Sequence, residues 1–110
     1  MARQRKATYR VPSPTFGKWL RTMRGAKGVP LRVVAAAAEM DQAHLSKVEL
    51  GQRLPTAEQT TALGRFFGVN QEEMEARRIA EKFRSEHAEN PAAAKALQIL
   101  NDASIFSHKE

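Results

Sequence analysis

The 110-residue chain contains no cysteine, so it can form neither a disulfide bond nor a metal site with thiolate ligands. Aromatic residues make up only 6% of the chain although hydrophobic residues make up 42%, so Leu, Val, Ala and Met are expected to supply the core. No hydrophobic run approaches the roughly 20 residues of a membrane-spanning helix, and no secretory signal peptide is expected. The length predicts one domain with an appended element.

Recognisable catalytic motifs are also lacking. The histidines, His44, His87 and His108, are scattered and have no carboxylate at metal-ligand spacing. There is no glycine-rich phosphate loop and no nucleophile elbow. The glutamates of residues 72–75 fit the start of a helix, where the macrodipole favours negative charge, better than an acid/base pair. We therefore expect neither an enzyme nor a cofactor.

Positive charge is concentrated in the first half of the chain. Residues 1–55 contain 11 Lys and Arg against 3 acidic residues, a net charge of +8, whereas residues 56–110 contain 7 against 9, a net charge of −2. A basic half joined to a mildly acidic half favours nucleic-acid binding by the first half. The alternative is a solvated surface that is basic without binding nucleic acid.

The basic half begins with residues 1–14, which have too few apolar side chains to bury a face and are expected to form a flexible arm. The arm has four basic residues and no acidic residue: Arg3, Arg5, Lys6 and Arg10. Such an arm can follow phosphates or enter a minor groove. It can also be a plain leader, and the sequence leaves both interpretations open.

A helix-turn-helix is predicted within residues 29–55. Its first helix is indicated by apolar residues three and four positions apart: Val33, Val34, Ala37 and Ala38. The second helix repeats this spacing at Leu45 and Val48, and Asp41 stands where a side chain can cap it. Between them lies a short turn that Met40 can fill. Two such helices form a unit that can place its second helix in the DNA major groove.

These residues resemble a known family. Ala35 stands ten residues before Leu45, and residues 46–55 read S-K-V-E-L-G-Q-R-L-P. This is similar to the pattern "A, nine residues, I-S-[RK]-[IV]-E-x-G-x-[RK]-x-P" of the phage-repressor-like (Cro/cI, XRE) helix-turn-helix proteins. The resemblance runs from Phe16 to about Met74. It departs at the turn, where Glu39 replaces the usual Gly, and at Pro30, which replaces the usual Ser or Thr cap.

The recognition helix is expected to span Gln42–Leu50. With Leu45 and Val48 facing inward, the outward positions are Gln42, Ala43, His44, Ser46 and Lys47. By resemblance, the base-reading positions among these are Gln42, Ala43 and Lys47, and the flanking positions are His44 and Ser46. Their chemistry suits base edges, since Gln can bond adenine, Lys can donate to guanine and an Ala methyl can meet a thymine methyl.

Phosphate contacts are expected on both sides of this helix. They should come from Leu31 and Arg32, at the start of the preceding helix, and from Gln52 and Arg53 after the recognition helix. Gly51 is expected to provide a left-handed backbone there.

The resemblance further implies an ion pair between Arg24 and Glu49, which would hold the recognition helix at its angle. The alternative is two independent surface charges.

Capping signals predict the remaining helices. Ser13 or Thr15 can cap a first helix that has Phe16 and Trp19 in the core and ends near residues 25–28. Thr56 and Gln59 form a capping box for a helix that stops at Gly68. A second box at residues 70–73 opens a helix whose apolar stripe continues through Ala76, Ile79, Ala80 and Phe83, and Asn90-Pro91 starts one more.

The resemblance implies five helices that close by about residue 75. The chain is therefore divided into the arm (1–14), the helix-turn-helix domain (15–75) and a C-terminal helical extension (76–110). The extension is predicted to carry dimerisation through its apolar residues, Phe83, Leu97, Leu100, Ile105 and Phe106. An intramolecular flap is the alternative.

The sequence thus predicts an all-α, five-helix repressor-like domain with a C-terminal helical extension. Its expected function is that of a transcriptional regulator, most simply a homodimeric repressor that binds a two-fold symmetric double-stranded DNA operator. By resemblance it would be cytoplasmic and of bacterial or phage origin, and a restriction–modification controller is one variant. The alternative is an antitoxin whose C-terminal helices bind a partner protein while the helix-turn-helix autoregulates. No membrane partner and no metal are expected.

Overall fold

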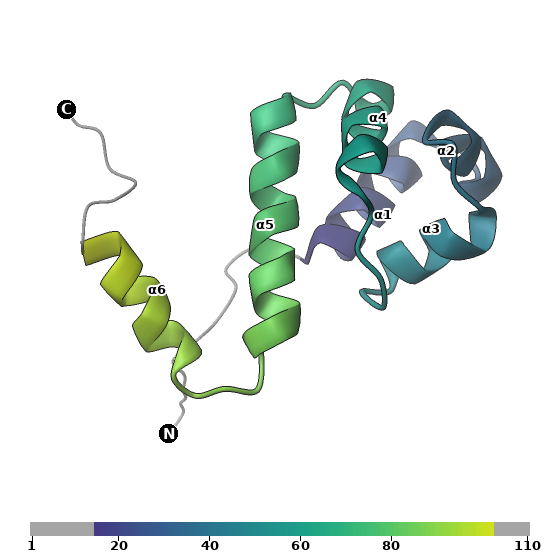
Figure 1. Ribbon diagram of the computed structural model, residues 1–110. Coiled ribbons are helices and arrows are strands. Elements are labelled where there is room, and N and C mark those ends of the chain that lie inside the picture. Colours follow the sequence, from purple (N-terminus) through teal and green to yellow (C-terminus); the bar gives the residue numbers. More distant parts are fainter. Residues whose placement is uncertain (1–14, 103–110) are drawn as a thin grey trace.

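The computed structural model describes residues 15–102, which form helices joined by turns and loops and contain no strand within that range (Figure 1). The helices are, in chain order, α1 (Phe16–Lys27), α2 (Leu31–Ala37), α3 (Gln42–Glu49), α4 (Ala57–Phe67), α5 (Gln71–His87) and α6 (Ala93–Asp102). The predicted all-α fold is confirmed.

Helix α1 begins and ends where its sequence provides caps. The Thr15 side chain accepts a hydrogen bond from the Lys18 backbone N–H at 3.2 Å, which satisfies one free donor of the first turn. The other predicted cap, Ser13, lies outside the described residues. At the far end Gly28 takes a left-handed conformation, with φ of 69°, and stops the helix.

The turn between α2 and α3 has the predicted position but not the predicted cap. Glu39 adopts a left-handed backbone, with φ of 55°, at the position that the family usually gives to Gly. The Met40 N–H donates to the Ala35 carbonyl oxygen at 3.0 Å, and its side chain packs against the core. Asp41 occupies the N-cap position of α3, but its side chain makes no capping hydrogen bond, so the predicted capping role of Asp41 is wrong.

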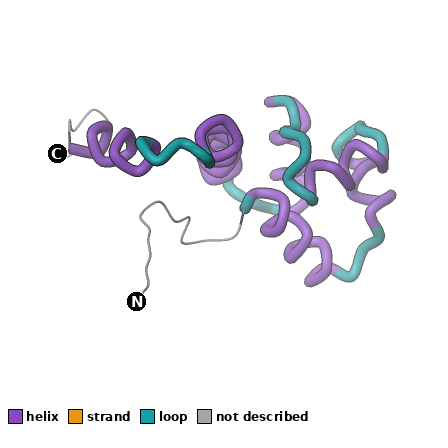
Figure 2. Tube along the Cα trace, turned by 90° about the horizontal axis from the view of Figure 1, so that it is seen from below, coloured by secondary structure: helices purple, strands orange, loops and turns teal. Residues whose placement is uncertain are grey.

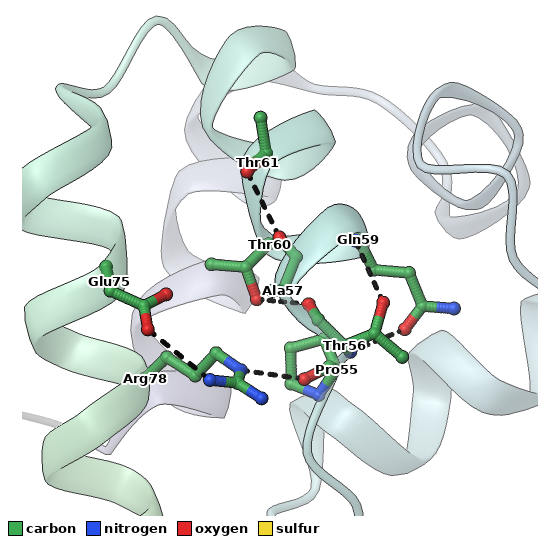
Figure 3. A network of polar contacts seen from close by, with 8 residues as sticks. All are labelled: Pro55, Thr56, Ala57, Gln59, Thr60, Thr61, Glu75 and Arg78. Atoms are coloured by element: carbon green, nitrogen blue, oxygen red, sulfur yellow. Dashed lines mark hydrogen bonds and ion pairs between the residues drawn. The ribbon is translucent and has the colours of Figure 1, made fainter.

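The predicted capping box of α4 is present, since Thr56 and Gln59 exchange side-chain-to-backbone hydrogen bonds at 3.0 and 2.9 Å. Figure 3 shows this start of α4 and its link to α5, where the Arg78 Nε donates to the Pro55 carbonyl oxygen at 2.9 Å. The second predicted box is only half formed. Asn70 caps α5, whereas the Glu73 carboxylate pairs with Arg77.

The core is built mainly from aliphatic side chains of α1 to α5, as the low aromatic content predicts. Its buried residues are Phe16, Leu20, Val34, Ala35, Ala38, Leu45, Val48, Leu63 and Met74. Helix α5 packs on both α4 and α1. Helix α6 extends to the side of α5 that is away from α1 to α4 (Figures 1 and 2), and Ala93 is its only buried residue among those described.

Candidate nucleic-acid interface

Helix α3 has a buried face and an exposed face. Leu45 and Val48 are each 1% exposed and anchor the helix in the core. Gln42, Ala43 and Lys47 are exposed to solvent. The helix therefore presents an amide, a methyl group and an ammonium group on its outer side, the combination that can contact base edges in a major groove.

Two of the five residues expected to face outward lie partly inside. His44 and Ser46 are half-buried, and His44 Nε2 is shielded from solvent without a hydrogen-bond partner. The expectation that His44 points outward is therefore wrong for this ring nitrogen. The reason is that residue 44, four positions before Val48, lies at the edge of the side of the helix that faces the core.

The expected phosphate-contacting residues flank α3. Arg32, Gln52 and Arg53 are exposed, whereas the Leu31 side chain is half-buried and packs against the core. A contact from Leu31 would therefore use its backbone amide. Gly51, with φ of 80°, has the left-handed backbone that the sequence predicts at the end of α3.

Arg24 of α1 lies beside Glu49, the last residue of α3, in a two-bonded arrangement. Arg24 Nε and Nη2 donate to the two Glu49 carboxylate oxygens at 2.8 and 3.1 Å, and Arg24 Nη1 donates to the Val29 carbonyl oxygen at 3.4 Å. The Glu49 side chain is only 7% exposed. Its carboxylate raises the pKa of Arg24 above the already high ordinary value. The pair joins α1 to the end of α3 through charge-assisted hydrogen bonds.

A second contact between the same helices was not predicted from the sequence. Gly17 is buried, and a Cβ placed there would lie 2.4 Å from the carbonyl oxygens of both Val48 and Glu49. Such a distance is far below van der Waals contact, so only glycine allows α1 to approach the end of α3 this closely. The one sequence signal is a glycine in the first turn of a predicted helix.

Helix α5 also contributes polar contacts that the sequence analysis missed. The Arg77 guanidinium lies 4.2 Å from the centre of the Trp19 ring, within cation–π range. Glu81 is buried, pairs with Arg84 and accepts a hydrogen bond from the Phe16 N–H at 3.3 Å. A carboxylate of α5 thus accepts a hydrogen bond from one of the free N–H groups at the start of α1.

The residues predicted to carry dimerisation are partly described. Leu97 and Leu100 of α6 are exposed, at 41% and 40%, and Phe83 is half-buried beside His87. Ile105 and Phe106 lie outside the described residues. The same is true of the four basic residues of the arm, Arg3, Arg5, Lys6 and Arg10.

Within residues 15–102, no group of three His, Cys, Asp or Glu residues is arranged to hold a metal ion. None of the helices described combines the length and apolarity required to cross a membrane.

The α2–turn–α3 unit, packed against α1 and α4, defines a helix-turn-helix fold. Comparison with protein families gives the same result, because the profile described as "Helix-turn-helix domain" matches residues 15–76. The match covers more than half of the chain, which therefore belongs to the helix-turn-helix domain family, a class of DNA-binding proteins. No curated protein and no solved structure matched the chain in the corresponding searches.

Proposed function

We propose that this chain is a transcriptional regulator of the phage-repressor-like (Cro/cI, XRE) kind. It binds a two-fold symmetric DNA operator as a homodimer, with α3 in the major groove, and represses transcription by occupying the operator. The observation that carries the proposal is the outer surface of α3, where Gln42, Ala43 and Lys47 are exposed while Leu45 and Val48 of the same helix are buried.

In this proposal the exposed residues divide into two roles. Gln42 and Lys47 read bases, because the Gln42 amide can donate to and accept from an adenine edge and the Lys47 ammonium group can donate to a guanine edge. Arg32, Gln52 and Arg53 contact phosphates, which positions the protein without reading sequence. The Arg24–Glu49 pair and the close approach at Gly17 hold the C-terminal end of α3, so they support its docking angle without contacting DNA.

Selection of bound fragments from random DNA, followed by competition binding, tests this division. Gln42→Ala or Lys47→Ala should cost roughly 1–3 kcal/mol per half-site on the selected operator and relax discrimination at one or two base pairs. Arg53→Ala should weaken selected and random DNA by similar factors and reduce the salt dependence. Neither Gln42 nor Lys47 belongs to the core, so the thermal unfolding temperature should hardly change.

Retention of the parent base preferences by both Gln42→Ala and Lys47→Ala would mean that α3 does not dock as proposed. Failure of the parent chain to enrich any DNA sequence would contradict the whole proposal.

The proposed homodimer is supported by exposed apolar side chains in the middle of α5 and on α6. Four large apolar side chains of this region are 40% to 58% exposed, Ile79, Leu97, Ile99 and Leu100. Several exposed apolar side chains in one region indicate an interaction site, whereas a single exposed apolar side chain does not. A second copy of the chain would also match the symmetry of operators that this motif reads.

The same surface supports a second candidate function. The chain could be an antitoxin whose α6 binds a partner protein while the helix-turn-helix autoregulates the operon. The mass of the purified complex separates the two candidates. A homodimer is expected for the regulator, whereas a partner protein in fixed ratio, encoded by a neighbouring reading frame, would favour the antitoxin.

A further inference from the structure

A groove lined mostly by polar and charged residues lies between the loop that follows α3 and the second half of α5. It is lined by Gly51, Gln52, Arg53, Leu54, Lys82, Ser85 and Glu86. Arg53, an expected phosphate contact, therefore shares one groove with Lys82, which is about 30 residues later in the chain and belongs to a different helix.

Helix α5 is held against this loop by contacts on either side of Lys82. The Arg78 Nε donates to the Pro55 carbonyl oxygen at 2.9 Å. A Cβ placed at Gly51 would lie 3.9 Å from Arg84 Nη2, which puts that guanidinium next to the loop. Lys82 therefore has a defined position relative to Arg53, not one that varies with a flexible linker.

The charges in the groove are accessible. Lys82 Nζ lies 2.7 Å from Glu86 Oε2, and the two side chains are 55% and 52% exposed. Lys82 lowers the pKa of Glu86, so this carboxyl group stays ionised. A solvent-exposed ion pair within one helix stabilises the fold little. Lys82 can therefore leave Glu86 and bind another anion with little loss of free energy. The Ser85 hydroxyl is already used, because it donates to the Lys82 carbonyl oxygen at 3.0 Å.

We propose that this groove receives the sugar–phosphate backbone of DNA just outside the base pairs that face α3, and that Lys82 contacts a phosphate there. This inference rests on the proposed function, because it requires Arg53 to lie on the backbone. A DNA strand is a continuous line of phosphates, so a groove that starts at Arg53 and continues to Lys82 follows its path. The negative charge of Glu86 repels the same phosphate and so limits the affinity for DNA.

Helix α5 is therefore part of the DNA-binding surface and extends it beyond the helix-turn-helix. The contact carries no base information, because it involves phosphates alone. It increases the affinity for all sequences and makes binding depend on the length of DNA that flanks the operator.

The test measures the affinity of the full chain for the best duplex recovered by selection, at several salt concentrations. One duplex carries about ten flanking base pairs on each side, one helical turn, and the other is trimmed to the selected site. On the long duplex, Lys82→Ala should reduce the slope of log K against log salt by about 0.9 per protomer, and Glu86→Gln should tighten binding. On the trimmed duplex, both variants should bind like the parent.

Lys95→Ala is the matched control, because Lys95 is an exposed lysine of α6 that does not line the groove. Since the chain has no cysteine, Lys82→Cys and Lys95→Cys each provide a single thiol for a DNA-cleaving iron chelate. The reagent at position 82 should cleave the flanking backbone at one defined place, and the reagent at position 95 should not produce that cleavage.

Equal slopes for Lys82→Ala and Lys95→Ala on the long duplex, or no localised cleavage from position 82, would overturn the inference. The proposed function would then still stand if Arg53→Ala lowers the slope. If Lys82→Ala lowers the slope equally on both duplexes, Lys82 acts as a general cation and the groove does not follow the flanking backbone. A parent chain that binds neither duplex would instead contradict the proposed function itself.

Discussion

At the scale of single residues, the C-terminal end of α3 is held by one face of α1. Gly17 and Arg24 are seven positions apart, so they lie two turns apart on the same side of that helix. Gly17 contacts the backbone of Val48 and Glu49, and Arg24 binds the Glu49 carboxylate. One contact depends on the absence of a side chain and the other on a planar, two-bonded ion pair. Together they fix both the distance and the rotation of α3 relative to α1.

Gly17→Ala tests the close approach. The added methyl group would lie 2.4 Å from two carbonyl oxygens, so α1 and α3 must separate. We expect the variant to lose about 1–3 kcal/mol of unfolding free energy, the usual cost of overpacking, as measured by urea denaturation. Gly25→Ala in the same helix is the control, because nothing lies within 4 Å of its added Cβ. It should gain about 0.5–1 kcal/mol through the higher helix propensity of alanine. Equal stabilities for the two variants would contradict the argument.

The residues of α3 show how far the sequence alone can place a site. The spacing of Leu45 and Val48 predicted the buried face, and in the structure Gln42, Ala43 and Lys47 are exposed. Two core residues define the direction of a face but not its width. His44 lies at the edge of that face, so the sequence could not decide whether its ring points to solvent or to the core.

Gly17 was missed for a different reason. A glycine near the start of a helix is compatible with any environment, and the closeness of a second helix is a property of tertiary packing. Glu39 was noted from the sequence only as a departure from the family pattern, which usually has Gly in the turn, and the structure shows that Glu39 takes the left-handed backbone there.

At the scale of elements, α5 packs on the domain through a largely polar face. Met74, Arg77, Arg78, Glu81 and Arg84 follow the three- and four-residue spacing of one side of a helix, and each is buried or half-buried. The stripe that apolar spacing predicted includes Ala76, Ile79 and Ala80, all of which are exposed. Hydrophobic periodicity therefore found the helix but not the side that faces the domain. The side that packs is set by the partners of the α5 Arg and Glu side chains. These partners lie on α1 and on the loop before α4, so the sequence of α5 alone does not reveal them.

Glu81→Ala tests this polar packing. It removes a buried acceptor from the Phe16 N–H and leaves Arg84 without this carboxylate, so unfolding free energy should fall by roughly 1–3 kcal/mol. Glu81→Gln keeps an acceptor oxygen and should lose less. Glu75→Ala is the control, because Glu75 makes an exposed pair with Arg78 at 3.5 Å, and its change should stay within about 0.5 kcal/mol. Urea denaturation in which Glu81→Ala and Glu75→Ala unfold alike would show that the Glu81 contact does not stabilise the fold.

At the scale of the whole molecule, the described chain largely separates two kinds of surface, although the apolar Leu50 at the end of α3 is 59% exposed. The exposed polar and basic residues of α2, α3 and the following loop belong to the first half, whereas the exposed apolar side chains of α6 belong to the second. Helix α5 stands between them (Figure 1). It packs on the DNA-binding unit through α1 and α4, and it leads through a short turn to α6. In a dimer formed through α6, the position of each α3 relative to the dimer interface would therefore be set by one helix, the α5 of the same protomer.

Removal of α6 tests this arrangement. The structure indicates where to cut, because α5 continues to His87 and carries the Glu81 contact, so a chain of residues 1–90 keeps α5 whole. We expect this chain to retain its helical circular dichroism and to sediment as a monomer. Its affinity for a two-fold symmetric operator should fall by about 100-fold or more, because the second half-site no longer binds at high effective concentration. Its affinity for a single half-site should change little, since α3 and its supports remain.

A full-length double variant, Leu97→Glu with Leu100→Glu, distinguishes loss of an interface from loss of a folded segment. Both side chains are about 40% exposed, so charges there should leave the single-chain fold intact while opposing the burial of α6 against a second copy. The variant should therefore sediment as a monomer with a nearly unchanged unfolding temperature. If the double variant and the shortened chain both keep the dimeric mass of the parent, the interface lies elsewhere, and the exposed Ile79 on α5 becomes the next residue to replace.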